Sequence, residues 1–172
     1  MAIDPNLKKE LSNEAERIEE DSLFSGKGHY NSVARWRWAQ HILGVLAPVA
    51  SAIAATAVFK QWGLDWAIGA AAVATVSAAV SASLKPGEYA DRHQRAGDRY
   101  FAVKNKARIF RRIELIGDSP EEKLKEAIKQ MSQEVADIRS GAPLIPRHAY
   151  QKTKQEIEVD KTTEYRVDKG PA

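Results

Sequence analysis

The chain has 172 residues and carries 26 Lys and Arg against 23 Asp and Glu, a formal net charge of +3. It contains no cysteine, which excludes disulfides, a thiol nucleophile, Cys-ligated zinc and iron–sulfur ligation. A hydrophobic fraction of 44% is too high for a wholly disordered chain, but these averages hide where the charges lie.

The first predicted element is an amphipathic helix over residues 6–24. Its apolar side chains recur at helical spacing: Leu7, Leu11, Ala15 and Ile18. Gly26 and Gly28 are expected to break this helix, and a second helix is expected to begin at His29. The Gly-Lys-Gly segment lacks the length and the following Ser or Thr of a phosphate-binding loop, so it predicts only a turn.

Two apolar runs follow, residues 42–59 and 66–84, and neither contains an ionisable side chain. The hydrocarbon core of a bilayer is about 30 Å thick and takes roughly 20 residues of helix. A six-residue connection that contains Gly63 joins the runs. The sequence therefore predicts a hairpin of two transmembrane helices, over about residues 39–60 and 65–84.

A soluble helical bundle is the alternative, because the second run is rich in alanine and a bilayer favours alanine only weakly. Covering two such segments would need a large soluble body, and the remaining residues are strongly charged. The membrane hairpin is therefore preferred.

The flanks of the apolar runs predict the topology. Basic and aromatic residues expected at the membrane interface are Arg35, Trp36, Arg37, Trp38, Trp62, Trp66 and Lys85. Lys and Arg are abundant before the first run and after the second, whereas the connection has a single Lys. By the positive-inside rule both termini should lie in the cytoplasm. The charged stretch before the first run also argues against a cleavable signal peptide.

Small residues in both runs are candidates for helix packing or for lining a pore. Ala70, Ala74, Ala78 and Ala82 repeat every four residues, a spacing that lets helices approach closely. Hydroxyl groups lie in the same runs: Ser51, Thr56, Ser77 and Ser81. These hydroxyls either bond to carbonyls of their own helix or line a contact or a water-filled path in an oligomer.

A long basic helix over residues 87–117 follows. It carries a seam spaced alternately by four and three residues, typical of a coiled coil: Tyr89, His93, Ala96, Tyr100, Val103, Ala107 and Phe110. This seam could pack against the same chain or a neighbour. The basic charge suits a topology signal and attraction to anionic lipid. Nucleic-acid binding is less favoured, because no aromatic cluster accompanies that charge.

Further helices are predicted over residues 120–140 and 147–158. Ser119 is expected as the N-cap of the first, with Pro120 at the first helical position and Glu122 at the third. Residues 159–172 are expected to form a disordered tail. The predicted class is all-α: a transmembrane hairpin with long cytoplasmic helical extensions, forming one domain over residues 1–158.

No catalytic or metal-binding pattern is found. His29, His41, His93 and His148 are scattered without metal-ligand spacing, and the sequence contains no nucleophile elbow, Walker lysine or dinucleotide fingerprint. The chain is not expected to be an enzyme or to hold a cofactor.

This arrangement resembles the SLATT family of bacterial two-transmembrane effector domains, over about residues 5–158. The likeness lies in the segment at 21–31, the Arg35-Trp36-Arg37 flank, the hairpin, the helix at 89–113, and the Ser-Pro-Glu-Glu and Pro-Leu-Ile-Pro motifs at 119–122 and 143–146.

The resemblance implies an anti-phage or conflict-system effector in the bacterial inner membrane. Such a protein would form an oligomeric pore or disrupt the membrane, causing cell death or dormancy. Its trigger would come from a separately encoded sensor, nucleotide-signal synthase or reverse transcriptase, and no catalytic residue is implied. The alternative function is a non-conducting membrane anchor or scaffold that recruits a cytoplasmic partner.

Overall fold

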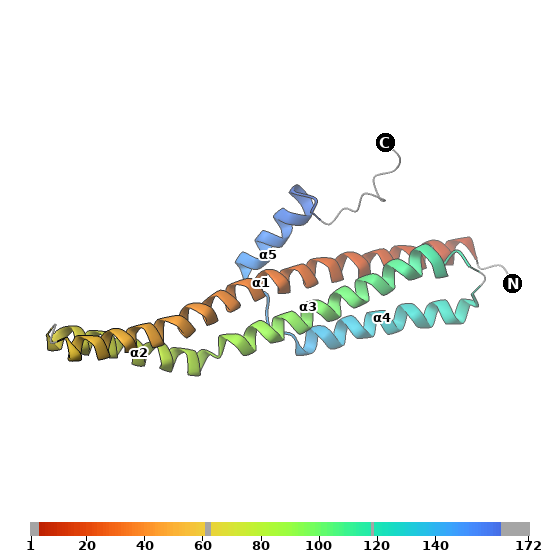
Figure 1. Ribbon diagram of the computed structural model, residues 1–172. Helices are drawn as coiled ribbons and strands as arrows, with labels where there is room; N and C mark the ends of the chain where they lie inside the picture. Colours follow the sequence, from red (N-terminus) through yellow and green to blue (C-terminus); the bar gives the residue numbers. More distant parts are fainter. Residues whose placement is uncertain (1–3, 61–62, 118, 163–172) are drawn as a thin grey trace. The chain divides into compact units, whose positions relative to one another are not determined.

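A computed structural model describes residues 4–60, 63–117 and 119–162 (Figure 1). Its secondary structure is helical throughout, with no strand among the described residues, which confirms the predicted all-α class. Two helices are long and apolar enough to cross a membrane. In chain order the elements are α1 (Pro5–Phe59), α2 (Leu64–Leu84), α3 (Pro86–Ile109), the π-helix η1 (Phe110–Glu114), α4 (Glu121–Gly141), α5 (Arg147–Lys154) and the π-helix η2 (Gln155–Val159).

Helix α1 continues through Gly26 and Gly28, so the predicted break between two N-terminal helices is wrong. Both glycines lie where another part of the chain approaches closely. A Cβ atom on Gly26 would lie 3.0 Å from the Phe101 ring, and one on Gly28 would lie 3.0 Å from Ile145. A glycine inside a helix costs only about 1 kcal/mol relative to alanine, and close packing offsets that cost.

A single residue, Lys85, separates α2 from α3. It adopts the left-handed conformation with φ 43° and ψ 55°. Its backbone N–H donates to the Ser81 carbonyl at 3.0 Å, and its ammonium group lies 3.2 Å from the Glu88 carboxylate. Pro86 then begins α3, where a missing backbone N–H is tolerated because the first turn has no partner for it.

The start of α4 differs by one position from the expected capping box. Pro120 is the N-cap residue, in an extended conformation with ψ 141°, and no side chain caps the helix. Ser119 therefore precedes the N-cap. Glu121 and Glu122 lie in the first turn, where the positive end of the helix dipole favours carboxylates.

The chain divides into two compact units, described separately below: unit 1 combines Met1–Ser32 with Arg92–Ala172, and unit 2 is Val33–Asp91. In unit 1, the N-terminal part of α1 packs with α3 and α4 around one apolar core. Full burial of a large apolar side chain contributes about 1.5–3 kcal/mol, so this core is the main source of stability in the unit. Its members are Leu11, Ala15, Ile18, Ala96, Tyr100, Val103, Ala107, Phe110, Leu115, Leu124, Met131 and Ile138.

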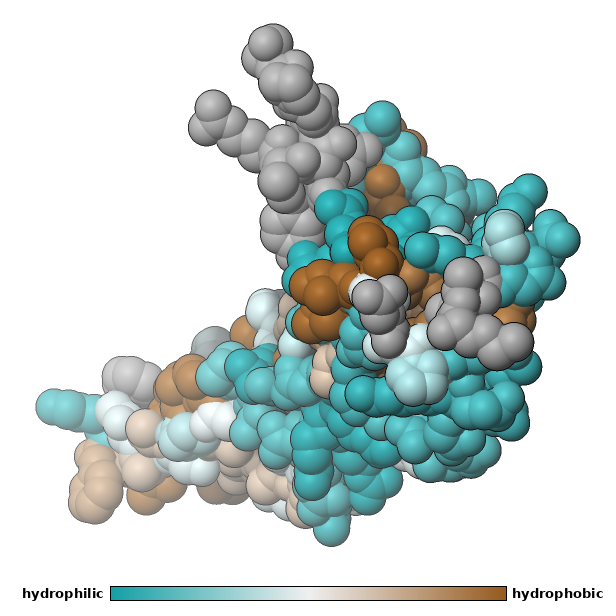
Figure 2. All heavy atoms as spheres, turned by 90° about the vertical axis from the view of Figure 1, so that its right-hand side faces the viewer, coloured by the Kyte–Doolittle hydropathy of each residue, from teal (hydrophilic) through white to brown (hydrophobic). Residues whose placement is uncertain are grey.

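Polar contacts fasten the surface of unit 1. Arg111 reaches Glu16 at 3.1 Å and Glu19 at 3.0 Å, which ties η1 to α1. The Asn31 side chain donates to Thr153 at 3.0 Å and to Glu156 at 3.1 Å, which holds α5 and η2 against α1. Hydrophilic side chains cover most of the visible face of the unit (Figure 2).

Candidate functional site in the apolar helices

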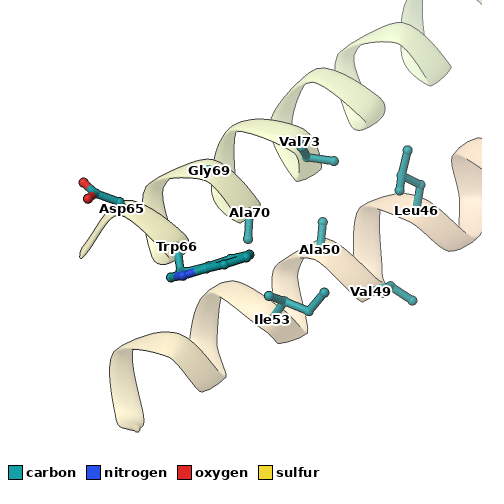
Figure 3. A pocket seen from close by; sticks show the side chains of 9 residues that line it. All are labelled: Leu46, Val49, Ala50, Ile53, Asp65, Trp66, Gly69, Ala70 and Val73. Carbon is teal, nitrogen blue, oxygen red and sulfur yellow. The ribbon is translucent and has the colours of Figure 1, made fainter. Parts of the chain in front are cut away.

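Unit 2 contains both apolar segments, residues 42–59 of α1 and the whole of α2, which lie alongside each other (Figure 3). The bounds of α2, Leu64–Leu84, agree with the expected 65–84 to within one residue. The buried side chains in the two segments are small: Ala50, Ala57, Ala67 and Ser77. Small side chains let helix backbones approach closely, so this pair is packed through alanine and serine.

The alanines of α1 that form this contact were not among the predicted packing residues of that helix, which were Ser51 and Thr56. Ala47 and Ala54 are half-buried and continue the face formed by Ala50 and Ala57. Their spacing of three, four and three residues is the repeat of one helix face, so the signal was present in the sequence. It was obscured because the whole run is apolar.

Larger apolar side chains point away from the contact. Val45 is 61% exposed, Val58 64%, Phe59 86%, Ile68 57% and Val76 61%. Only 11% of the 18-residue apolar stretch in each helix is buried. A core helix of a soluble protein would be mostly buried, so the described part of this chain does not cover these segments as a soluble core would.

A groove of about 540 Å³ opens between the two segments (Figure 3). Its walls are apolar except for Asp65 at one end. The remaining lining residues are Leu46, Val49, Ala50 and Ile53 from α1 and Trp66, Gly69, Ala70 and Val73 from α2. The lining of this groove suits an apolar occupant.

The predicted alanine ladder divides between two environments. Ala70 and Ala74 are half-buried, whereas Ala78 and Ala82 are exposed. Four residues advance a helix by one turn plus about 40°, so a strict four-residue repeat drifts away from a partner helix. Ser77, which is buried, and Ser81, which is half-buried, take the place of the last two alanines beside α1.

Two of the predicted pore hydroxyls bond within their own helix. Ser51 donates to the Ala47 carbonyl at 2.9 Å, and Thr56 donates to the Ala52 carbonyl at 2.8 Å. Both residues are exposed. Each hydroxyl group donates its hydrogen bond inside its own helix, so neither needs an acceptor from another helix or from water.

The predicted interface residues lie at the ends of the apolar segments. Trp36 stacks on Tyr89 with ring centroids 4.8 Å apart, which joins the start of the first segment to α3 within unit 2. Exposed side chains at the segment ends are Arg35, Arg37, Trp38, Trp66 and Lys85. Trp62 lies outside the described residues.

The predicted seam of α3 is occupied by the same chain. His93, Ala96, Tyr100, Val103, Ala107 and Phe110 are all buried within unit 1, whereas Tyr89 belongs to unit 2, is exposed and stacks on Trp36. The seam from His93 to Phe110 therefore packs within unit 1 and is not an exposed docking face.

A pair of histidines interrupts the apolar seam. The Nδ1 atoms of His29 and His93 lie 2.9 Å apart, both rings are buried, and Tyr100 stacks on His29 at 5.6 Å. Burial, with a smaller effect of His93, lowers the pKa of His29 to about 4, and burial also lowers the pKa of His93. Both rings are therefore neutral near pH 7. Sequence spacing gave no sign of this pair, because 64 residues separate its members.

No group of three His, Asp or Glu side chains suitable for a metal ion occurs among the described residues. The site consists of apolar faces, a groove and small-residue contacts, and its chemistry is that of packing and partition between water and lipid. No protein-family model, curated protein or solved structure matches this sequence.

Proposed function

We propose that this protein is an oligomeric membrane effector of a bacterial conflict system, as its resemblance to the SLATT family implies. The hairpin of α1 and α2 would cross the inner membrane twice, with both termini in the cytoplasm. A signal from a separately encoded partner would change its packing, open a pore or disrupt the membrane, and stop growth.

One observation carries the membrane part of this proposal. Both apolar segments leave nearly all of their long side chains exposed, and each is long enough to cross the hydrocarbon core. Two water-exposed surfaces of this length would be an aggregation hazard, whereas a bilayer covers them without a penalty.

A second face of α2 supports association between copies. Ala71, Thr75, Ala78 and Ala82 lie beside the α1 contact and are all exposed. The Thr75 hydroxyl bonds to the Ala71 carbonyl at 2.9 Å, so this face has no unsatisfied hydroxyl. A neighbouring helix could approach this face closely, as small residues allow in membranes.

The decisive test is the double substitution Ala78→Leu with Ala82→Leu. Both positions are exposed, so leucines there leave the α1–α2 contact intact and block close approach from outside. We expect loss of growth arrest and of dye entry when the variant is expressed with its trigger, while the protein stays in the membrane fraction. Ala74→Leu is less suitable, because Ala74 lies partly against α1.

Ala72→Leu with Ala79→Leu is the matched control. These alanines are also exposed but lie on average about 90° around the helix from Ala78 and Ala82. The control should keep full toxicity. Unchanged killing and dye entry in the Ala78/Ala82 variant would reject the pore model.

A membrane scaffold is the second candidate, and an exposed apolar stripe favours it. Ile109, Ile113 and Ile116 are 44%, 65% and 70% exposed at spacings of four and three residues. Such a stripe suits an amphipathic partner helix. Ion flux through liposomes reconstituted with the protein and its trigger separates the candidates, since a scaffold gives none.

A further inference from the structure

The groove between α1 and α2 runs along both apolar segments of unit 2 (Figure 3). Its lining on α2 extends from Asp65 to Val73, a separation of eight residues, or about 12 Å at 1.5 Å per residue. The hydrocarbon core of a bilayer is about 30 Å thick, so each leaflet provides about 15 Å. The groove therefore has about the depth of one leaflet and begins beside the connection between the two helices.

The two ends of the groove differ in polarity. Asp65 lies in the first turn of α2, and its carboxylate points past the end of the groove rather than into it (Figure 3). Leu46 and Val73 line the opposite end. Trp66, next to Asp65, is 67% exposed, and tryptophan rings favour the depth of lipid head groups. This arrangement suits an occupant with a cationic group near Asp65 and an apolar remainder.

Small residues keep the middle of the groove open. Ala50 lines it from α1, and Gly69 and Ala70 line it from α2. A Cβ atom on Gly69 would meet nothing within 4 Å. The volume of about 540 Å³ lies within the range of roughly 300–1,000 Å³ that is usual for small-ligand sites. Contact between copies is proposed above for another face of α2, from Ala71 to Ala82, which leaves the groove to lipid.

We propose that this groove binds one acyl chain of a lipid whose head group carries a primary ammonium group, as in phosphatidylethanolamine. The ammonium group pairs with Asp65 at the membrane surface, and the chain follows the groove toward Leu46 and Val73. A primary ammonium offers three N–H donors to a carboxylate, whereas the trimethylammonium group of phosphatidylcholine offers none. The site therefore distinguishes the two lipids by their head groups. This inference rests on the membrane part of the proposed function and not on pore formation.

The test measures which lipid the full chain retains. The protein is reconstituted in nanodiscs of equal parts phosphatidylethanolamine and phosphatidylcholine with matched acyl chains, released into detergent, and weighed by native mass spectrometry. We expect the lipid that stays bound to be enriched in phosphatidylethanolamine by about twofold to fivefold, the effect of an ion pair at an exposed position.

Gly69→Leu tests the groove itself. The leucine side chain occupies the space of the acyl chain, so the lipid-bound fraction should fall by about threefold or more. Gly44→Leu is the matched control, because a Cβ atom there also meets nothing within 4 Å and Gly44 does not line the groove. The control should retain lipid like the wild type. Circular dichroism checks that both variants keep their helix content.

Asp65→Asn tests the recognition of the head group. Asparagine has nearly the same shape but no charge, so the variant should retain a similar total amount of lipid and lose the preference for phosphatidylethanolamine. Glu88→Gln removes an exposed carboxylate of the same unit that does not line the groove, and should keep the preference.

The proposal is overturned if the wild type retains the two lipids in equal amounts, or if the Gly69→Leu and Gly44→Leu proteins retain lipid alike. It is also overturned if Gly69→Leu lowers the fraction of oligomers in the same spectra and leaves lipid retention unchanged, because the groove then holds a helix of a second copy. Failure of the membrane proposal is a different result: the wild type would not enter nanodiscs, and carbonate would release it from membranes.

Discussion

His29 and His93 form the most unusual contact at the scale of single residues. Two imidazole Nδ1 atoms 2.9 Å apart require one ring to donate and the other to accept, so the contact exists only while at least one ring is neutral. Each ring is buried, and protonation would place a charge in the core of unit 1 without an acidic partner in that hydrogen bond.

The pair predicts that unit 1 loses stability on acidification. The folded-state pKa of His29 is lowered to about 4, below the unfolded value of 6.5, and that of His93 is also lowered. The unfolded chain therefore binds more protons between these pH values. The stabilising effect is complete above about pH 6.5 and decreases as pH falls toward 4, by on the order of 3 kcal/mol for His29. Thermal unfolding in detergent from pH 7.5 to 4.5, followed by circular dichroism, measures the loss.

His93→Asn provides the comparison for the pH experiment. Asparagine can place a hydrogen-bonding group near the position of Nδ1 but does not titrate, so its unfolding temperature should fall less steeply with pH than that of the wild type. Carboxylates and His29 are present in both proteins, so the difference between the two slopes isolates the contribution of His93. Identical slopes would show that His93 does not contribute to acid sensitivity.

At the scale of secondary-structure elements, the close contact between α1 and α3 depends on glycine residues in both helices. Gly97 of α3 faces Gly26 of α1, and a Cβ atom on Gly97 would lie 3.3 Å from the Gly26 carbonyl oxygen. A backbone atom in the middle of a helix cannot move aside as a flexible side chain can. Gly97→Ala should therefore destabilise unit 1 by about 1–3 kcal/mol, although alanine favours helix over glycine.

Gly44→Ala is the matched control for this substitution. A Cβ atom there would meet nothing within 4 Å, so we expect no loss of stability. Both variants are compared with the wild type by denaturant or thermal unfolding in the same detergent. A Gly97→Ala protein as stable as the Gly44→Ala protein would contradict close packing between α1 and α3.

Helix faces were predictable from the sequence where one periodic pattern decided them. The seam from His93 of α3 to Phe110 of η1 is buried as its spacing of three and four residues indicates. Its partner was not predictable, because the choice between the same chain and a neighbour depends on contacts distant in sequence. Gly26 and Gly28 were misread for the same reason, since a glycine that ends a helix and one that allows close packing look identical in the sequence.

The sequence analysis also did not predict which basic residues would line a cavity. Arg92, Arg95 and Arg99 were counted as part of a basic flank, and only the fold adds the end of α4 that turns their face into a cavity. Conversely, the membrane candidate was clear from the sequence, because the absence of ionisable residues over 18 positions is a local property.

The whole molecule combines a charged unit built from both ends of the chain with an apolar unit built from its middle. This division explains the modest net charge of +3, because basic and acidic residues nearly cancel in unit 1 while unit 2 contributes few of either. If unit 2 lies in the membrane, the short connection after α1 and the helices of unit 1 must face water. For that arrangement the positive-inside rule predicts that unit 1 lies in the cytoplasm.

The absence of cysteine makes this topology directly testable with single cysteine variants. Asp65→Cys lies in the first turn of α2, beside the connection, and Ser132→Cys lies on the exposed surface of α4. In bacteria with a permeabilised outer membrane, an impermeant maleimide should label Asp65→Cys and leave Ser132→Cys unlabelled. Lysis should expose both. If Ser132→Cys alone is labelled before lysis, unit 1 lies outside the cytoplasm. If neither variant is labelled before lysis and carbonate releases the protein from the membrane, the soluble bundle is favoured over the transmembrane hairpin.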